Sequence, residues 1–303
     1  MLDIQWVNYK DMGGPVHRGA KKDGKYLYEY KLGDGNDEWG KIMGVIADCE
    51  GRYDTVVMYD GTGVTFGAFQ WTLTSGRLQG FLTHLSNVKR FDWLHEFGMY
   101  ICNGYLYSNS MTTGEEPVRL LPNKQKKDIV KLCLGHGRER AMNLCEKFAI
   151  LGSSPVVHDM QNEYMSSELT KVLYAKRKPL QVVGGSIAHL LPYDVGDTPI
   201  HAIFFNLFQN LPGGAFRFFM DVMKTALDKG LVRFSVDKGY HSVSSYDDLL
   251  MLLWEKLCKT SIANWGFGSR RYLRNKNNLP RITRLGPAIK KYYAIDLPLA
   301  EEC

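Results

Sequence analysis

Residues 37–50 have the sequence DEWGKIMGVIADCE, and residues 51–72 continue as GRYDTVVMYDGTGVTFGAFQWT. The first segment predicts an amphipathic helix, because its apolar residues recur every three or four positions and therefore share one face. That face carries Trp39, Ile42, Met43, Ile46 and Cys49. Asp37 is a favourable residue to cap the start of this helix, and Gly51 is expected to end it. Glu50 is thus expected as the last residue of a helix that buries its apolar side.

The second segment predicts short strands. Residues 55–73 are rich in β-branched and aromatic residues, and turn signals interrupt them at Asp60-Gly61 and at Gly63, as in a hairpin. A helical period returns at Arg77 and is expected to continue through residues 91–100. Further helices are predicted at residues 126–134, 138–151, 160–175, 202–210, 216–228 and 245–260. We therefore expect an α+β protein that is predominantly helical, with a small β-hairpin after its first helix and an enlarged helical C-terminal part.

The segment before the first helix has a different character. Residues 27–32 (LYEYKL) alternate aromatic and charged side chains, as a half-buried strand does. Gly13-Gly14-Pro15 and Gly33-Asp34-Gly35 are turn signals. Residues 1–36 are therefore expected to form a β-rich N-terminal extension, and residues 37–303 a helix-rich body.

The composition is that of a globular protein. Of the 303 residues, 45% are hydrophobic and 23% charged, which excludes a disordered, collagen-like or coiled-coil chain. The formal net charge of +6 favours polyanionic partners, such as nucleic acid, an anionic cell wall or a membrane surface. Two local runs of positive charge, both expected to face water, are Lys124, Lys126, Lys127 and Arg270, Arg271, Arg274, Lys276.

The cysteines form no metal-binding pattern. The sequence contains no Cys-x-x-Cys pair, and no His lies at zinc-ligand spacing from a cysteine. We expect reduced thiols at all six positions, and no metal or cofactor: Cys49, Cys102, Cys133, Cys145, Cys258 and Cys303. Residues 1–10 do not resemble a signal peptide, and no stretch approaches the roughly 20 apolar residues of a membrane span. The protein is therefore expected to be made in the cytoplasm and delivered to any outside target by another route.

The polar residues around the predicted hairpin form the candidate site. A carboxyl group at the end of an apolar-faced helix, as expected for Glu50, is partly desolvated and can hold the proton that a general acid needs. A short turn exposes Asp60, and Thr65 can offer its hydroxyl as donor or acceptor. Two carboxyl groups across a cleft are typical of a glycosidase, in which one protonates the leaving oxygen and the other activates water.

This order of residues resembles the Glu–Asp–Thr signature of phage-type lysozymes. The matching positions are Glu50-Gly51, Tyr59-Asp60, Gly63, Thr65 and Gly67. In that family a helix-terminal Glu leads into a small β-hairpin that bears the Asp and the Thr. The resemblance implies that Glu50 is the general acid and that Asp60 and Thr65 position the hydrolytic water. The loop between Asp60 and Thr65 is one residue shorter than the family pattern.

A second segment, Gly67-Ala68-Phe69-Gln70, resembles the Gly-Leu-Met-Gln segment of goose-type lysozymes and lytic transglycosylases. It implies that Gln70 faces the sugar cleft. Tyr59 and Trp71 are candidates for stacking on sugar rings, although such rings more commonly pack in a core. Asp54 is an alternative second carboxylate or substrate ligand, but it lies only four residues from Glu50 and can instead cap the turn.

The resemblance covers only about residues 39–80, yet it implies a lysozyme-like fold for residues 37–303. Residues 37–125 would form the catalytic helix and hairpin lobe, and residues 126–303 a helical lobe or an appended helical region. The implied activity is hydrolysis of the linkage between N-acetylmuramic acid and N-acetylglucosamine in bacterial peptidoglycan. The implied biology is that of a monomer acting either as a holin-dependent phage endolysin or as a virion lysozyme.

Several alternatives stay open at this point. A lytic transglycosylase would use the sugar's own 6-hydroxyl as the nucleophile, and a chitosanase would share the lysozyme-like core. An inactive wall-binding or virion structural protein would keep the fold for binding alone. A nucleic-acid binder ranks last; it would use the basic residues 270–284 with the interleaved aromatic residues Trp265, Phe267 and Tyr272.

Overall fold

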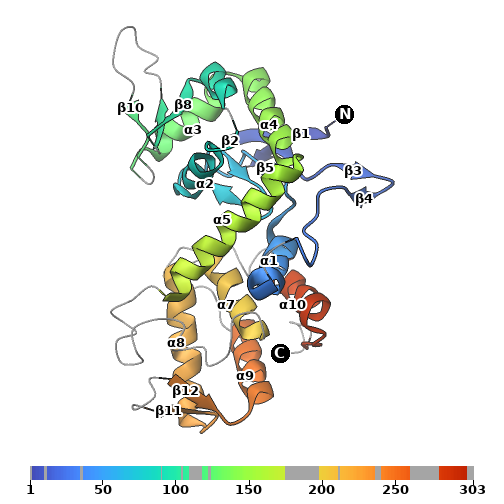
Figure 1. Ribbon diagram of the computed structural model, residues 1–303, viewed down its shortest axis with the longest axis vertical. Helices are drawn as coiled ribbons and strands as arrows, with labels where there is room; N and C mark the ends of the chain where they lie inside the picture. Colours follow the sequence, from blue (N-terminus) through green and yellow to red (C-terminus); the bar gives the residue numbers. More distant parts are fainter. Residues whose placement is uncertain are drawn as a thin grey trace. The chain divides into compact units, whose positions relative to one another are not determined.

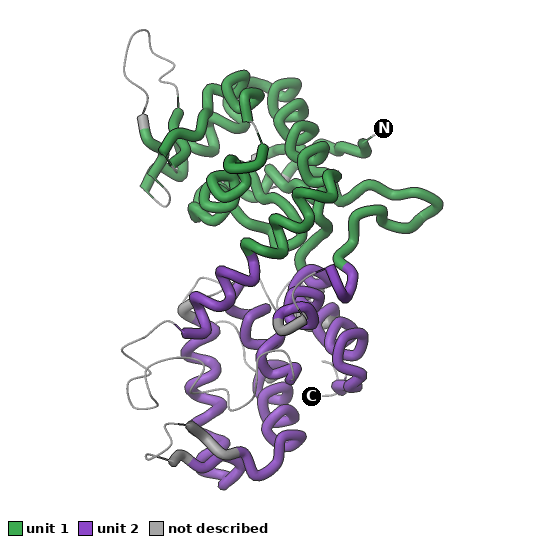
Figure 2. Tube along the Cα trace, in the orientation of Figure 1, with its two compact units in different colours: residues 1–30, 50–164 green, residues 31–49, 165–303 purple. Residues whose placement is uncertain are grey.

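The computed structural model describes residues 2–9, 12–34, 37–89, 91–103, 105–108, 118–121, 124–174, 198–210, 212–235, 240–259 and 280–298. Helices predominate and are combined with small antiparallel sheets (Figure 1), so the expected mixture of the two is confirmed. The chain forms two compact units that alternate along the sequence (Figure 2). The first contains Met1–Tyr30 and Glu50–Tyr164, and the second contains Lys31–Cys49 and Met165–Cys303.

A five-stranded antiparallel sheet organises the first unit, in the order β1-β2-β5-β6-β7. Its strands are β1 (Ile4–Tyr9), β2 (Met12–His17), β5 (Val56–Val57), β6 (Thr65–Phe66) and β7 (Trp71–Thr72). β5 and β6 form the predicted hairpin, and Val56 pairs with Phe66. Val16 of β2 pairs with Val57 of β5, so the N-terminal strands extend the hairpin into one sheet.

The remaining elements of the first unit follow the sheet along the chain, except for one early hairpin. That hairpin consists of β3 (Lys21–Lys22) and β4 (Lys25–Tyr26). The later elements are α2 (Arg77–Leu85), the 3-10 helix η1 (Asp92–Phe97), β8 (Met99–Cys102), β9 (Tyr105–Ser108), β10 (Val118–Arg119), α3 (Lys126–Leu134), α4 (Arg138–Gly152) and α5 (Pro155–Tyr174). Helix α4 packs against β1, β2 and β5 (Figure 1), and the last half of α5 belongs to the second unit.

The predicted strand at residues 27–32 is wrong. The segment contains bends and a turn and pairs with no strand, and its aromatic side chains instead contact neighbouring rings. The Tyr28 ring lies 5.6 Å from the His158 ring, and the Tyr30 ring lies 6.3 Å from that of Tyr53. The main chain is held by separate contacts and not by a ladder: Tyr53 N donates to Tyr28 O at 3.0 Å, and Leu27 N donates to Ala20 O at 2.9 Å.

The predicted helix over residues 91–100 is present only as a 3-10 helix at residues 92–97, and the prediction is wrong for residues 98–100. The 3-10 helix η1 ends at Phe97, because the next residue, Gly98, has a positive φ of 69° that breaks the helical path. β8 then starts at Met99, and Tyr100 faces Tyr107 of β9 with ring centroids 5.4 Å apart. The aromatic cross-strand pair favours the strand over a helix continuation.

The second unit is built from helices and one two-stranded sheet. Its elements are α1 (Asp37–Glu50, without its last residue), the second half of α5, α7 (Pro199–Asn210), α8 (Pro212–Asp228), β11 (Val232–Ser235), β12 (Tyr240–Val243), α9 (Tyr246–Lys259) and α10 (Pro280–Tyr293). The helix predicted at residues 37–50 is therefore confirmed. Trp39 of α1 packs edge-on against Phe205 of α7 at 5.4 Å, and Phe204 packs in the same way against Phe219 of α8 at 4.8 Å.

Helix α10 packs against α1 within this unit. A Cβ atom added to Gly44 would approach the Tyr292 ring to 2.5 Å, so only glycine permits this close contact. Lys291 Nζ forms an ion pair with Asp48 at 2.8 Å, and Arg284 Nη1 donates to the Cys49 carbonyl at 3.2 Å. These cations lie at the carboxyl end of α1, where the helix dipole favours positive charge.

Candidate functional site

Glu50 is the last residue of α1, as expected, and its side chain is half-buried. The helix that carries it is fixed by a fully buried face in the second unit, on which Ile42, Met43 and Ile46 are 0% exposed. The chain leaves the helix in a tight turn, in which Arg52 N donates to Thr55 Oγ1 at 2.8 Å. Glu50 is thus presented at the start of a fixed loop that leads into β5.

Asp60, Thr62 and Thr65 form one hydrogen-bonded group, which we name the hairpin cluster. Asp60 Oδ1 accepts from Thr62 N at 3.1 Å and from Thr62 Oγ1 at 2.5 Å. Asp60 Oδ2 accepts from Thr65 Oγ1 at 3.2 Å, and the two threonine hydroxyl oxygens are 2.7 Å apart. Three of the roughly four acceptor positions of the Asp60 carboxylate are therefore used, and this exposed group can accept another hydrogen bond from water.

Two glycines with left-handed backbone shape the loop that carries the hairpin cluster. Gly61 has φ 78° and Gly63 has φ 77°, values that a side chain disfavours. Space is restricted as well, because a Cβ atom on Gly63 would lie 3.1 Å from Ile129 Cγ2. The sequence predicted Asp60 and Thr65 but not Thr62, although an Asp followed two residues later by Thr is typical of a side-chain-stabilised turn.

The turn over residues 67–70 is held by a side chain from a distant helix. Gln161 of α5 is 0% exposed; its Oε1 accepts from Ala68 N at 2.9 Å, and its Nε2 donates to Tyr53 O at 3.0 Å. A Cβ atom on Gly67, which has φ 84°, would collide with Gln161 Oε1. Gln161 therefore ties this turn to the loop after Glu50, and no local sequence signal pointed to it.

The predicted substrate-binding residues have different surroundings. Gln70 is half-buried, with φ 49°, and its Nε2 donates to Gly67 O at 2.8 Å, so its amide braces its own turn. Tyr59 is half-buried next to the hairpin cluster. Trp71 is 0% exposed and lies 4.7 Å from the Phe81 ring and 5.2 Å from the Tyr164 ring. Trp71 is thus a core residue and has no exposed face for a sugar.

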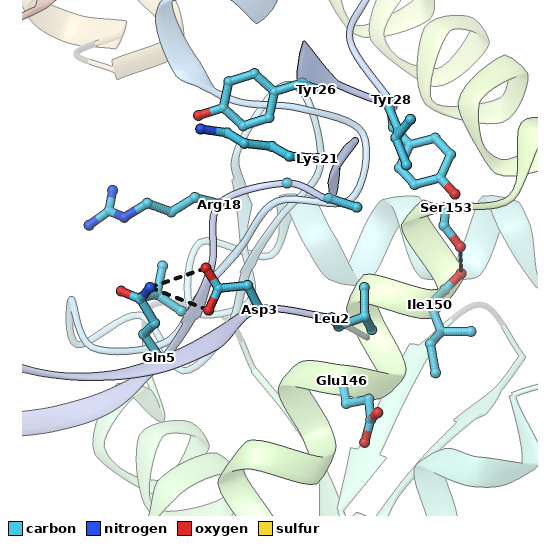
Figure 3. Close-up of a pocket in the computed structure, with 14 residues that line it drawn as sticks. Leu2, Asp3, Gln5, Arg18, Lys21, Tyr26, Tyr28, Glu146, Ile150 and Ser153 are labelled. Atoms are coloured by element: carbon cyan, nitrogen blue, oxygen red, sulfur yellow. Dashed lines mark hydrogen bonds between the residues drawn. The ribbon is translucent and has the colours of Figure 1, made fainter. Parts of the chain in front are cut away.

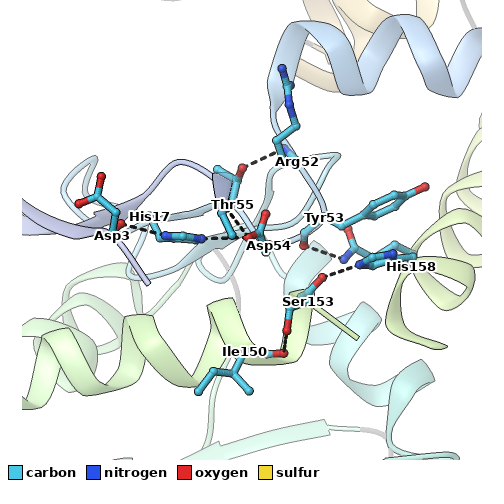
Figure 4. Close-up of polar contacts among 12 residues, drawn as sticks. Asp3, His17, Arg52, Tyr53, Asp54, Thr55, Ile150, Ser153 and His158 are labelled. Atoms are coloured by element: carbon cyan, nitrogen blue, oxygen red, sulfur yellow. Dashed lines mark hydrogen bonds and ion pairs between the residues drawn. The ribbon is translucent and has the colours of Figure 1, made fainter. Parts of the chain in front are cut away.

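Asp54 is buried in an ion pair with His17 (Figure 4). His17 Nε2 lies 2.9 Å from Asp54 Oδ2, and His17 Nδ1 lies 2.9 Å from the Asp3 carbonyl oxygen. Because both neighbours are acceptors, the arrangement fits an imidazolium with a proton on each nitrogen. Asp54 Oδ2 also accepts from Ala20 N at 2.8 Å. Asp54 therefore joins the N-terminal strands to the loop after Glu50, a structural role.

The electrostatics of this pair favour the charged form of His17. Burial lowers the pKa of His17, but the hydrogen bonds to Asp54 and to the Asp3 carbonyl, with the charges of both residues, outweigh it. The pKa is therefore raised above its ordinary value of 6.5. A raised pKa in the native state stabilises the fold fully below the unfolded pKa, and this contribution disappears as the pH rises through the folded pKa.

The protein is accordingly expected to lose stability as the pH rises above about 6.5, by about 1.4 kcal/mol for each unit by which folding raises the pKa of His17. Urea unfolding at intervals from pH 6 to pH 9 measures this dependence. His17→Gln lacks the titrating group and should show a flatter profile in the same window. Parallel profiles for the two proteins would contradict the assignment.

The cysteines and the charged runs behave as expected where the structure describes them. Cys49, Cys102, Cys133, Cys145 and Cys258 are free thiols, and Cys303 lies outside the described residues. Burial raises the pKa of the Cys133 and Cys145 thiols to about 12, which makes them unreactive. The side chains of Lys124, Lys126 and Lys127 are exposed to solvent. The basic run Arg270, Arg271, Arg274, Lys276 and the aromatic residues Trp265, Phe267 and Tyr272 lie outside the described residues.

Two other kinds of site are absent from the residues that the structure describes. No helix among the described residues is both long enough and apolar enough to cross a bilayer. Within those residues, no group of three or more His, Cys, Asp or Glu side chains is arranged to hold a metal ion. In the comparisons with known proteins, no family model, no curated protein and no solved structure matches this chain.

Proposed function

We propose that this protein is a peptidoglycan-cleaving glycosidase of the lysozyme type, with a lysozyme-like fold. The observation that carries the proposal is the hairpin cluster: Thr65 Oγ1 donates to Asp60 Oδ2 at 3.2 Å, in the hairpin that follows a helix ending in Glu50. An acid at a helix end and a hydroxyl–carboxylate pair on the next hairpin together supply the groups that acid-assisted hydrolysis of a glycoside needs.

The roles follow from the chemistry of each group. Glu50 gives its proton to the glycosidic oxygen as the bond from that oxygen to the anomeric carbon breaks. Asp60 and Thr65 hold a water molecule, which adds through its oxygen to the anomeric carbon while Asp60 takes its proton. Thr62 fixes the Asp60 carboxylate by two hydrogen bonds, so that the attacking water meets a carboxylate with a defined orientation.

Other features support the same proposal. The half-buried Glu50 and the exposed Asp60 provide carboxyl groups in different surroundings, as the acid and base roles require. Tyr59 and Gln70 are the candidate sugar contacts that are partly open to solvent. The net charge of +6 favours association with an anionic cell wall. Delivery as a holin-dependent endolysin or within a virion is part of the proposal.

Mass spectrometry of digested peptidoglycan tests the proposal. The purified chain is expected to release fragments that end in reducing N-acetylmuramic acid. Fragments with anhydro ends would instead show a lytic transglycosylase, the alternative supported by the resemblance of residues 67–70 to the Gly-Leu-Met-Gln segment. That result would also contradict the water-activating role of Asp60. Binding to cell walls without the release of any fragment would overturn the enzyme proposal. Chitosan is the comparison substrate, because its cleavage would support the chitosanase alternative.

A further inference from the structure

A cavity of about 770 Å³ lies in the first unit, among β1, the β3–β4 hairpin and α4 (Figure 3). We name it the N-terminal pocket. Its volume is in the usual range for a site that holds a small ligand, roughly 300–1,000 Å³. Its lining includes two cations, Arg18 and Lys21, and two carboxylates, Asp3 and Glu146. None of these four residues belongs to the hairpin cluster.

The charges of the N-terminal pocket are separated. Figure 3 shows Arg18 and Lys21 in one part of the pocket and Glu146 in another. Asp3 accepts from the Gln5 amide at 3.1 Å, whereas neither Arg18 nor Glu146 forms an ion pair within the residues that the structure describes. A ligand carrying only negative charge would be repelled by the two carboxylates. The pocket therefore suits a ligand that carries both a carboxylate and an ammonium group.

Part of the pocket lining is held by the buried His17–Asp54 pair. His17 Nδ1 bonds to the Asp3 carbonyl, and Asp54 accepts from Ala20 N. The side chains of Leu27 and Ile150, 46% and 54% exposed, supply apolar contact surface in the same lining. A site fixed in this way loses little freedom when a ligand binds.

One wall connects the N-terminal pocket to the loop after Glu50. The Tyr26 ring lies 4.4 Å from Lys21 Nζ and 4.4 Å from Arg52 Cζ. Arg52 is held by Glu29 at 3.0 Å, and its Nη1 donates to the carbonyl of Gly51, the residue next to Glu50, at 3.0 Å. A ligand in the pocket is therefore bound by a wall that is continuous with the proposed catalytic loop.

From these observations we infer that the N-terminal pocket binds the peptide stem of peptidoglycan. The inference rests on the proposed function for the identity of the polymer. The stem is a short peptide that carries carboxylates and, on its diamino acid, an ammonium group, and it is attached to the muramic acid whose linkage Glu50 would cleave. Arg18 and Lys21 bind its carboxylates, and Glu146 binds its ammonium group.

Calorimetric titration of the full chain with the free tetrapeptide L-Ala-γ-D-Glu-diaminopimelate-D-Ala tests this inference. Arg18→Ala and Glu146→Ala are each expected to raise Kd by about tenfold or more, since each removes one charge-assisted contact. Lys22→Ala is the matched control. Lys22 is an exposed lysine next to Lys21 in the β3–β4 hairpin, but it does not line the pocket, so the variant should leave Kd unchanged. Acetylation of the diaminopimelate amine should weaken binding to the parental protein but not to Glu146→Ala.

Two outcomes separate this inference from the proposed function. Cleavage of peptidoglycan without measurable tetrapeptide binding, or with equal Kd for all variants, would overturn the pocket assignment and leave the glycosidase proposal standing. Tetrapeptide binding that responds to Arg18→Ala and Glu146→Ala, in a protein that cleaves no glycan, would support the pocket and overturn the glycosidase. The parental enzyme should also cleave intact strands faster than strands whose stems have been removed by an amidase, and Arg18→Ala should lose that difference.

Discussion

Glu50→Gln is expected to slow the cleavage of peptidoglycan by about 10²–10⁴-fold, the usual contribution of a general acid. The amide keeps the size and shape of the side chain but has no acidic proton to give to the leaving oxygen. The buried face of α1 is unchanged, so the helix should keep its place. Release of new reducing ends from purified peptidoglycan measures the rate, and thermal unfolding measures the stability.

Asp48→Asn is the matched control for this experiment. Asp48 lies on the same helix two residues earlier, is partly exposed and is paired with Lys291. Its replacement changes a carboxylate to an amide as Glu50→Gln does, but at a position without a proposed chemical role. Its rate should stay close to that of the parent. A parental rate for Glu50→Gln would show that another residue is the acid.

Asp54→Ala is expected to lower mainly the stability, and Asp60→Ala mainly the cleavage rate, although both remove a carboxylate from the same short segment. Asp54→Ala leaves His17 buried without its partner, which should lower the free energy of unfolding by about 3–5 kcal/mol. Asp60→Ala removes an exposed carboxylate and its hydrogen bonds in the hairpin cluster, so the free energy of unfolding should fall by only about 1 kcal/mol while the cleavage rate falls by about 10²-fold or more. Urea unfolding and the reducing-end assay separate the two results.

A further variant tests the reason for the loss of stability. His17→Leu with Asp54→Leu removes both charges together, so it should be less destabilised than Asp54→Ala. An Asp54→Ala protein that is as stable as the parent but inactive would contradict the structural role and restore Asp54 as a candidate catalytic carboxylate.

Local sequence patterns predicted the elements whose formation depends on near neighbours. The apolar period of residues 37–50 gave the limits of α1, because a buried helical face repeats every three or four residues. The β5–β6 hairpin was predicted from Asp60, Gly61 and Gly63, because few residue types other than Gly, Asn and Asp adopt the backbone conformations of a tight turn. The strand predicted at residues 27–32 was wrong, because alternation shows which side chains are buried and does not provide a strand partner.

In the candidate site, too, only the contacts between residues close in sequence could be predicted. Asp60 and Thr65 lie in one short loop, so their closeness follows from the hairpin itself. The burial of Asp54 depends on His17, which is 37 residues away, and the support of Ala68 depends on Gln161, which is 93 residues away. Contacts between residues so far apart in the sequence produce no periodic pattern from which they could be predicted. The same is true of Trp71, whose aromatic side chain suits a sugar or a core equally well until its neighbours are known.

The hydrogen bond from Gln161 to the Tyr53 carbonyl spans 108 residues of chain and has a consequence for synthesis. All three proposed catalytic residues leave the ribosome early, and Asp54 can already tie the loop after Glu50 to the N-terminal strands, but the contact with Gln161 forms only after α5 has emerged. A nascent or truncated chain that stops before residue 161 therefore contains the proposed catalytic residues without the support that Gln161 gives to Tyr53 and Ala68. The order of translation thus delays the assembly of the site until more than half of the protein has been made.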